Sequence, residues 1–254
     1  LCDTNVAPLY AAAAEASFAA AGFTVFRYVY PAGEEQKNLE TLGQILQYLG
    51  EQGFTRTDLL AALGGGVCGD MGGFAAAVFQ RGIDFVQIPT TLLAAVDSSV
   101  GGKTAVDLPC GKNMAGCFYQ PRAVICDPDL FDTLPPEVFA CGMAETIKTG
   151  AILDADLFDK LETCDIRREI ELVVGRCCEI KRAVVEEDER DLGLRQLLNF
   201  GHTIGHGIER VSDFTVPHGY AVAMGMVMMA RAGERMGAVE SGTAERLIAI
   251  LQRY

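Results

Sequence analysis

A change of pattern near residue 130 most constrains the fold of this chain. Up to about residue 128, short apolar runs of strand length alternate with helical or glycine-rich segments. These runs are 59–63, 84–89 and 123–127. Beyond about residue 130 strand signals stop, and long segments have the periodicity of helices: 137–163, 166–187, 195–211 and 219–253. We therefore predict an α/β domain over residues 1–130 and an all-α domain over 131–254, divided near Pro135 and Pro136.

Charge, hydrophobicity and cysteine content limit the kinds of partner and the compartment that we expect. The net charge of −13 opposes the phosphate contacts that dominate nucleic-acid affinity, so a small-molecule partner is expected. No apolar run is long enough for a membrane span, and the N-terminus lacks the pattern of a signal peptide. The nine cysteines are an odd number without C-x-x-C spacing, which is typical of reduced thiols. We expect a cytoplasmic protein that binds neither nucleic acid nor membrane.

The segment GGGVCGDMGG follows the apolar run LLAAL and leads into an alanine-rich helix. Glycines at such a turn let the backbone approach a phosphate, and the amides at the helix N-terminus favour its charge. Gly64, Gly66 and Gly69 satisfy G-x-G-x-x-G, a weak pattern by itself. Later glycines in the segment could instead permit close helix packing. The acid that usually binds the ribose would be Asp84, but its place at the start of an expected strand argues against that role.

Single charged and hydroxyl side chains stand between glycines and short apolar stretches in the next segment. They are Thr90, Thr91, Asp97, Lys103, Lys112 and Asn113. We predict that these side chains converge on an anionic ligand, and the alternative is that they form a solvated surface. Further on, Glu145 and Lys148 are three residues apart on an expected helix. An ordinary surface ion pair is the alternative there, but the glycine and methionine before Glu145 argue against a solvated face.

All three histidines lie within residues 202–218. If residues 199–210 are helical, His202 and His206 share one face, and His218 reaches it only if the chain turns back near Pro217. Imidazole is well suited to hold a metal, but catalytic zinc sites commonly add a carboxylate. The cluster predicts a metal site whose acidic ligand must come from elsewhere in the chain.

Six segments in this order resemble the 3-dehydroquinate synthase family over essentially the whole chain. They are GGGVCGDMGGF, RGIDFVQIPTTLLAAVDSSVGGKTAVD, GKNMAGCFYQP, GMAETIK, LRQLLNFGHTIGHGIE and HGYAVAMGMV. The resemblance implies an NAD-binding α/β domain, a helical domain that carries Zn²⁺ or Co²⁺, and a homodimer. The implied reaction converts 3-deoxy-D-arabino-heptulosonate 7-phosphate to 3-dehydroquinate and phosphate, in the shikimate pathway of aromatic amino acid biosynthesis. Transient oxidation by NAD, phosphate elimination, reduction and intramolecular aldol closure make the enzyme a lyase without net redox change.

The resemblance also implies roles for individual residues. The metal ligands would be Glu145, His202 and His218. The NAD site would include Asp3, Asn5, Glu34, Lys37, Gly65, Gly66, Val67, Asp70, Thr90, Thr91, Leu93, Asp97, Lys112 and Asn113. Substrate would contact Arg81, Asp97, Lys103, Asn113, Lys148, Lys181, Arg195, Asn199 and His206. Lys148, Lys181, Arg195, Asn199 and His206 would be the catalytic group, and Arg81 would reach the phosphate site of a neighbouring subunit.

The chain departs from the family pattern at both ends, where an opening strand and the last helices are absent, so we expect a fragment. Val138 occupies a position that is glutamate in some members, and the neighbouring Glu137 is left without a role. Three alternatives stay open: another sugar phosphate cyclase, a metal-dependent dehydrogenase of the glycerol dehydrogenase type, and a chain that only binds nucleotide. Lys148, Lys181, Arg195 and Asn199 together favour the synthase over the dehydrogenase.

Overall fold

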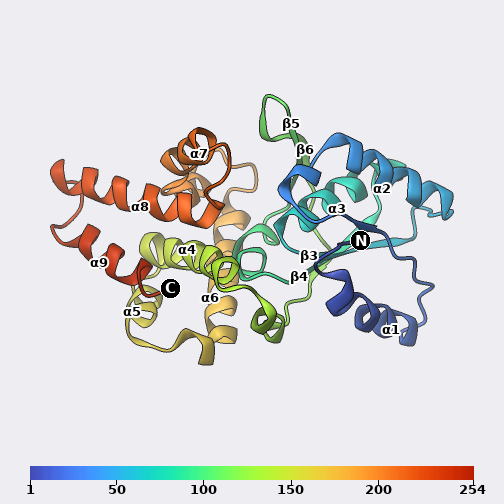
Figure 1. Ribbon diagram of the computed structural model, residues 1–254, viewed down its shortest axis with the longest axis horizontal. Helices are drawn as coiled ribbons and strands as arrows, with labels where there is room; N and C mark the ends of the chain where they lie inside the picture. The colour runs from blue at the N-terminus through green and yellow to red at the C-terminus, as the bar shows by residue number, and fades with distance from the viewer. The chain divides into compact units, whose positions relative to one another are not determined.

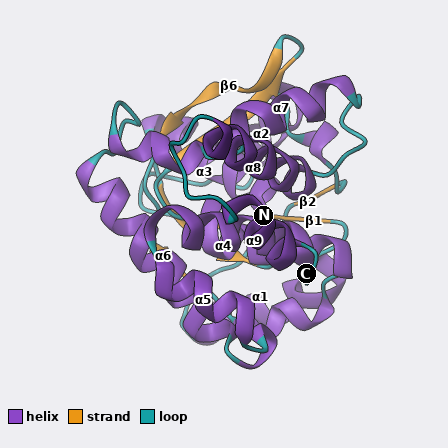
Figure 2. Cartoon of the chain, turned by 90° about the vertical axis from the view of Figure 1, so that its left-hand side faces the viewer, coloured by secondary structure: helices purple, strands orange, loops and turns teal.

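The computed structural model describes residues 1 to 254 and divides them into two compact units, Leu1–Leu130 and Phe131–Tyr254. Every strand belongs to the first unit, and the second consists of helices and loops (Figures 1 and 2). The predicted succession of an α/β fold and an all-α fold is confirmed. None of the helices combines the length and the apolar character needed to cross a membrane.

Short strands form the centre of the first unit. The strands are β1 (Cys2–Asp3), β2 (Val29–Tyr30), β3 (Leu59–Gly64), β4 (Asp84–Pro89), β5 (Lys103–Leu108), β6 (Gly111–Phe118) and β7 (Ala123–Val124). Strand β1 pairs in parallel with β2, and a second parallel sheet has the order β3-β4-β7. Because β3 and β4 run in register to their last residues, Gly64 and Pro89, the loops that follow them leave from the same edge of the sheet.

The helices of this unit are α1 (Ala12–Ala20), α2 (Leu39–Glu51) and α3 (Gly66–Val78). Helix α2 buries Leu42, Ile45 and Leu49, the apolar stripe that helical spacing puts on one face. Helix α3 packs closely on the sheet because it has glycines there. A Cβ on Gly73 would come within 2.4 Å of the Thr104 side chain. The close-packing interpretation therefore holds for this later part of the glycine segment.

The strand predictions in this unit were incomplete in two respects. The third predicted strand is only Ala123–Val124, because the chain then leads into a 3₁₀ helix that begins at Pro128. The antiparallel pair of β5 and β6 was missed altogether. Its glycines and isolated charges hide the alternation of apolar and polar residues that marks a strand.

Six α-helices build the second unit. They are α4 (Pro136–Leu153), α5 (Ala155–Thr163), α6 (Ile170–Glu187), α7 (His202–Val211), α8 (His218–Arg235) and α9 (Thr243–Leu251). Two 3₁₀ helices join them, η6 (Ile166–Arg168) and η7 (Leu194–Asn199). The core includes Met143 and Ile147 of α4 and Met226 of α8, all fully buried.

Three predicted helices were wrong in their continuity or their start. The segment 137–163 is broken at Asp154, which is extended and caps α5 by accepting a hydrogen bond from the Leu157 N–H at 2.9 Å. The segment 219–253 is interrupted between Arg235 and Thr243, where Gly237 and Gly242 have positive φ. Helix α7 begins at His202 rather than near residue 199, because Gly201 has a φ of 80°.

Two glycines of α8 allow close approach to neighbouring helices. A Cβ on Gly225 would lie 2.1 Å from the carbonyl oxygen of Gly201, just before α7. A Cβ on Gly219 would lie 2.3 Å from the Cα of Cys141 in α4. Both contacts are with backbone, which cannot swing aside as a side chain can. Helix α8 can therefore lie against α4 and α7 only if these positions lack a side chain.

We expect Gly225→Ala to lower the free energy of unfolding by about 1–3 kcal/mol, because the added methyl group must push α7 and α8 apart. Gly207→Ala is the matched control. Gly207 is a helical glycine of α7 with no atom near its Cβ position, so alanine should be neutral or stabilise by about 0.5–1 kcal/mol. Denaturant unfolding of the three proteins measures the difference. Equal stability of both variants would contradict the close approach.

Candidate functional site

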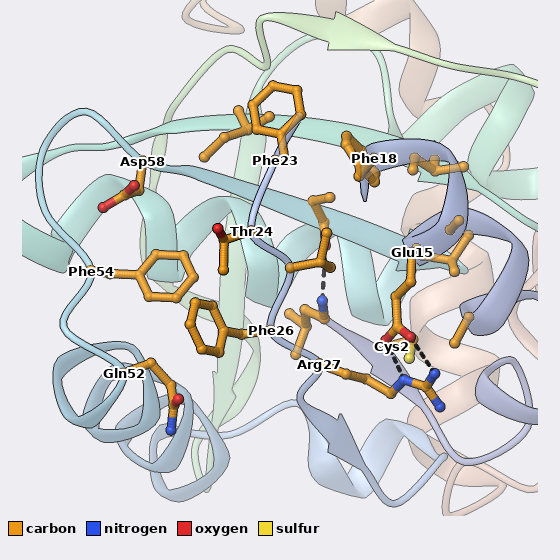
Figure 3. Close-up of a pocket in the computed structure, with 18 of the residues that line it drawn as sticks. Cys2, Glu15, Phe18, Phe23, Thr24, Phe26, Arg27, Gln52, Phe54 and Asp58 are labelled. Carbon is orange, nitrogen blue, oxygen red and sulfur yellow. Dashed lines mark hydrogen bonds and ion pairs between the residues drawn. The ribbon is translucent and has the colours of Figure 1, made fainter. Parts of the chain in front are cut away.

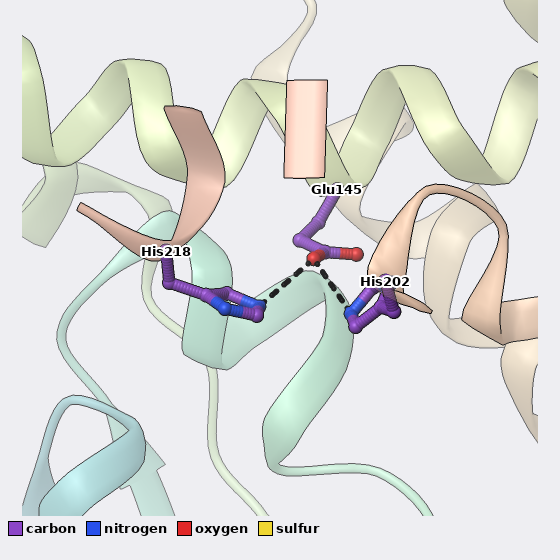
Figure 4. A group of neighbouring side chains, drawn as sticks. All are labelled: Glu145, His202 and His218. Carbon is purple, nitrogen blue, oxygen red and sulfur yellow. Dashed lines mark ion pairs between the residues drawn. The ribbon is translucent and has the colours of Figure 1, made fainter. Parts of the chain in front are cut away.

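A buried carboxylate between two imidazoles forms the core of a candidate metal centre in the second unit. Glu145 lies in the middle of α4 and is 1% exposed. Its Oε1 is 3.4 Å from Nε2 of His202 and 3.3 Å from Nε2 of His218. The two histidines are the first residues of α7 and α8 and point toward this oxygen from either side (Figure 4). The structure thus brings together the three residues that the resemblance names as metal ligands.

The local sequence explains why both histidines point inward. Gly201, in the left-handed conformation, ends the preceding loop and starts α7 at His202. Pro217 precedes His218 with an extended backbone and starts α8 in the same way. Because Gly219 lets the start of α8 touch α4, His218 is carried to the helix that holds Glu145. The turn back near Pro217 is therefore present, as the histidine spacing required.

The charges around Glu145 are unusual for a protein interior. Lys148 forms an ion pair with Oε2 of Glu145, and both side chains are almost fully buried. The alternative of a surface pair at this helical spacing is therefore excluded. Burial lowers the pKa of His202 below its ordinary value, although Glu145 opposes the shift. Burial would also lower the pKa of His218, but the carboxylates of Glu145 and Glu209 raise it to about 9.

This donor set fits a divalent metal ion. One carboxylate oxygen and two imidazole nitrogens lie within 4.8 Å of one another. Zinc and similar ions are held by three such protein ligands in catalytic sites, where a further position is left for substrate or water. His218 lies between the carboxylates of Glu145 and Glu209, and a metal ion there would supply positive charge beside Glu145.

A second group of potential ligands shares His218. It consists of His206, Glu209 and His218, again within 4.8 Å of one another. The His206 side chain is 61% exposed, whereas Glu209 is 3% exposed and lies 3.5 Å from Nδ1 of His218. Glu209 had no predicted role. Its spacing of three from His206 and seven from His202, all on one helical face, was the signal that could have found it.

Three buried cations accompany the metal ligands in this unit. Lys148 of α4 is 2% exposed, Lys181 of α6 is 8% exposed and Arg195 of η7 is 2% exposed. Their three elements contact one another. Arg195 donates from Nη1 to the carbonyl oxygen of Glu189 at 2.7 Å. Asn199, at the end of the same 3₁₀ helix, is exposed. Buried positive charges gathered in this way suit an anionic ligand.

The glycine loop of the first unit has the geometry of an anion site. Strand β3 ends at Gly64 and α3 begins at Gly66, and no side chain caps the helix. A Cβ on Gly65 would lie 3.2 Å from the side chain of Thr91, so the loop and the end of β4 are in close contact. The N–H of Thr90 donates to the carbonyl oxygen of Gly64 at 2.9 Å. Free helix amides at the carboxyl edge of a parallel sheet are suited to a phosphate.

Other predicted residues lie at the end of β1, in α3, after β4 and at the start of β5. Asp3 ends β1 and accepts hydrogen bonds from the N–H groups of Asn5 and Val6 at 2.8 and 3.0 Å. Val67 is in the first turn of α3, Leu93 and Asp97 follow β4, and Lys103 begins β5. Asp84 is different. It pairs with Leu59 at the opposite end of the strands, about 16 Å from the glycine loop at strand spacing, so it cannot bind a ribose there.

A network of ion pairs and hydrogen bonds joins several of the other residues assigned to NAD. Nζ of Lys37 lies 2.6 Å from Oδ2 of Asp70 and 2.6 Å from Oδ1 of Asn113. Lys37 is 5% exposed, and although burial alone would lower its pKa, the Asp70 carboxylate raises it. Asp107, which had no predicted role, accepts from the Asn113 N–H at 2.7 Å, and its own N–H donates to the Lys37 carbonyl oxygen. Lys112 pairs with Glu34 at 3.4 Å.

Arg81 lies apart from these groups in the 3₁₀ helix that follows α3 (Phe79–Arg81). It is exposed and has a φ of 67°, a left-handed conformation that is uncommon for a residue with a side chain. It takes no part in the glycine loop or in the Lys37 network. Its predicted role toward a neighbouring subunit needs such an outward position.

A cavity of about 390 Å³ in the first unit contains none of the predicted site residues. Figure 3 shows its aromatic lining and one ion pair: Phe18, Phe23, Phe26 and Phe54, with Arg27 paired to Glu15. Because it has no residue in common with the predicted sites, the cavity is separate from the candidate site.

Comparison with known proteins identifies close relatives over the whole chain. The 3-dehydroquinate synthase N-terminal family model matches residues 27–141, and the C-terminal model of the same family matches 142–254. The 3-dehydroquinate synthase of Clostridium acetobutylicum is 48% identical over 257 residues, which cover 99% of this chain and 72% of the relative.

Solved structures agree with this result. A 2-deoxy-scyllo-inosose synthase, complexed with carbaglucose-6-phosphate, NAD⁺ and Co²⁺, has a TM-score of 0.90 at 30% identity, covering 99% of this chain and 71% of that one. A 2-epi-5-epi-valiolone synthase from Streptomyces hygroscopicus, with NAD⁺ and Zn²⁺ bound, has a TM-score of 0.91 at 26% identity, with 99% and 72% covered. Glycerol dehydrogenase from Schizosaccharomyces pombe, at 17% identity and a TM-score of 0.72 with 99% and 68% covered, shares the fold alone.

The family models and the relative together account for both units, including the residues that form the metal-ligand cluster and the glycine loop. This chain belongs to the 3-dehydroquinate synthase family.

Proposed function

We propose that this chain is a 3-dehydroquinate synthase that converts 3-deoxy-D-arabino-heptulosonate 7-phosphate to 3-dehydroquinate and phosphate. The main support is a sequence identity of 48%, over 99% of the chain, to an enzyme of that name. The reaction is a carbon–oxygen lyase reaction, because the oxidation and the reduction cancel within each turnover. The candidate site supports it chemically, since it combines a metal-ligand group with buried cations for an anionic sugar phosphate.

NAD and a divalent metal ion, Zn²⁺ or Co²⁺, are the cofactors. When bound, NAD would accept and return a hydride, and the metal would polarise hydroxyl groups of the substrate. Glu145, His202 and His218 would hold the metal, supported by their mutual proximity and by the burial of the carboxylate. The solved cyclases with NAD⁺ and Co²⁺ or Zn²⁺ support the same pair of cofactors.

The NAD-binding role falls to residues 1–130 in this proposal. The amides of Gly65, Gly66 and Val67 would face the pyrophosphate at the start of α3. Thr90 and Thr91, directly after β4, offer hydroxyl groups beside the same loop. The network of Lys37, Asp70 and Asn113 supplies polar groups for the rest of the dinucleotide. The remaining NAD contacts are proposed for Asp3, Asn5, Glu34, Leu93, Asp97 and Lys112.

Substrate-binding roles are proposed for residues of each unit. Lys148, Lys181 and Arg195 would hold the carboxylate and the phosphate, because buried cations bind such groups more strongly than exposed ones. Asp97, Lys103 and Asn113 would orient the sugar. Asn199 is exposed at the end of η7 and can donate to a substrate oxygen.

His206 is the candidate for proton transfer. Its side chain is largely exposed, and its Nε2 lies 4.0 Å from Oε2 of Glu209, within the same helix. An imidazole that can reach ligand and solvent can take a proton at Nε2 and release it again as the phosphate leaves. It is not one of the three residues assigned to the metal.

The alternatives are less well supported. The two solved cyclases that make other rings are 30% and 26% identical to this chain, against 48% for the synthase. The glycerol dehydrogenase is 17% identical, which shows fold only. A dehydrogenase would also have no use for three buried cations in its metal-binding unit.

We further propose that the chain acts as a homodimer in the cytoplasm. The exposed position and left-handed backbone of Arg81 support a contact with a second subunit. The nine cysteines are all free thiols, a state typical of a reducing compartment.

The activity is tested with purified protein, the heptulosonate phosphate, NAD⁺ and Zn²⁺. We expect phosphate release and formation of 3-dehydroquinate without net accumulation of NADH, because the hydride is returned in each turnover. Glucose 6-phosphate and glycerol serve as control substrates. Formation of a carbocycle from glucose 6-phosphate would indicate another cyclase. Steady production of NADH from glycerol would indicate a dehydrogenase, and NAD⁺ binding without any turnover would indicate a chain that only binds nucleotide.

Glu145→Gln should abolish turnover and raise the dissociation constant for Co²⁺ at least about tenfold, because a neutral amide is a poorer ligand than a carboxylate. Metal content after dialysis and the visible absorption of bound Co²⁺ measure the loss. Glu137→Gln, an exposed residue in the first turn of the same helix, is the control and should bind as the unaltered chain does. Unchanged metal content in Glu145→Gln would remove Glu145 from the site.

Mixing two inactive variants tests the role of Arg81 across subunits. Arg81→Ala and Glu145→Gln should each be inactive, but a random mixture forms mixed dimers in which one site has both residues intact. About a quarter of the unaltered activity should return if partners exchange freely. Sedimentation should give a mass of twice 27.2 kDa. A sedimenting monomer, or a dimer without recovery after demonstrated exchange, would contradict the shared site.

A further inference from the structure

Glu209 is a buried carboxylate that the proposed function does not use. It lies near the end of α7, and its side chain is 3% exposed. Its oxygens face two histidines, with Oε1 3.5 Å from Nδ1 of His218 and Oε2 4.0 Å from Nε2 of His206. A carboxylate is kept in such a place only when a cationic or hydrogen-bond-donating group offsets the loss of water.

The ring of His218 lies between two carboxylates. Its Nε2 faces Glu145 at 3.3 Å, and its Nδ1 faces Glu209 at 3.5 Å. A neutral imidazole has one N–H and one free lone pair, so a hydrogen donated from Nδ1 leaves the Nε2 lone pair for a ligand on the Glu145 side.

His202 has the same arrangement with a different partner. Its Nε2 faces Glu145 at 3.4 Å, and its Nδ1 lies 3.3 Å from the carbonyl oxygen of Phe200. Both imidazoles thus turn Nε2 toward one carboxylate and have a hydrogen-bond acceptor at Nδ1. Metal-bound histidines usually have such an acceptor on the second nitrogen, which selects the tautomer and fixes the ring.

The backbone around Glu209 holds the side chain in this place. Its carbonyl oxygen accepts from the N–H of Phe214 at 2.8 Å and from the hydroxyl group of Ser212 at 3.0 Å. Gly205 is on the same face of α7, and a Cβ added there would lie 3.1 Å from the Ala221 backbone. Helix α8 therefore lies close to this face. Glu209 therefore reaches His218 from a rigid helix.

We propose that Glu209 is a positioning residue that accepts a hydrogen bond from Nδ1 of His218 and so directs Nε2 of that ring toward the metal held with Glu145 and His202. This inference rests on the proposed metal site. The competing explanation is that Glu209 is itself a ligand in the group with His206 and His218.

The test compares Glu209→Leu, which removes the acceptor, with Glu209→Gln, which can keep an oxygen in place. Co²⁺ affinity is measured by competition with a chelator, and the number of bound ions is measured by metal analysis. We expect Glu209→Leu to raise the dissociation constant about 10- to 100-fold, the range found for the outer partners of metal ligands. Glu209→Gln should stay within about threefold of the unaltered chain. Glu186→Leu, an exposed glutamate of α6, controls for the loss of one negative charge.

A spectroscopic readout separates positioning from a general structural role. The chain has three histidines, so ¹⁵N-labelled rings in the Zn²⁺-loaded protein give three assignable patterns. In Glu209→Leu the Nδ1–H of His218 should exchange faster with water, while that of His202, held by Phe200, should not change.

Each other outcome has a definite meaning. Unchanged Co²⁺ affinity and an unchanged His218 ring in a folded Glu209→Leu would overturn the proposal, as would equal disturbance of both rings. Loss of one whole equivalent of bound Co²⁺ would identify Glu209 as a ligand instead. If Glu209→Leu does not fold, a Glu209→Gln variant with more than tenfold weaker binding would count against the proposal. Absence of Co²⁺ binding by the unaltered chain would remove the proposed metal site itself.

Discussion

The buried carboxylate of Glu145 is the constraint on which the helical unit depends. A charged group that is 1% exposed is strongly disfavoured unless positive or hydrogen-bond-donating groups surround it. Lys148 comes from the same helix, but His202 and His218 must be brought from the starts of two others. Three helices therefore converge on one side chain, and the same convergence creates a place where a metal ion would be held.

This convergence and the packing of the helices are one feature of the fold. In the motif GHTIGH, the glycines at 201 and 205 meet the backbone of α8, while His202 turns toward Glu145. Gly219, directly after His218, does the same against α4. A side chain at any of these positions would separate the helices and move the ligands apart. The sequence motif thus combines packing residues with chemical ones.

In the α/β unit the glycines also have two functions. Those at the end of β3 leave helix amides open at the carboxyl edge of the sheet, whereas Gly73 only allows α3 to pack on its neighbours. Most positive charges of this strongly acidic chain are exposed, but a few, including Lys37, Lys148 and Arg195, are buried. The net charge led to the expectation that nucleic acid is not the partner, but it did not indicate these local positions suited to anionic ligands.

The sequence by itself determined the two fold classes, most of the helices, the glycine loop and the family, because periodicity and motif spacing are local properties of the chain. It did not predict the β5–β6 pair or the break at Asp154, where local patterns were weak or continuous. Only the tertiary structure showed that Glu145 and Lys148 are buried rather than a surface pair, and that Glu209 and Asp107 face residues of the candidate sites. Burial and convergence depend on contacts between residues far apart in the chain, and no local pattern records which of them will meet.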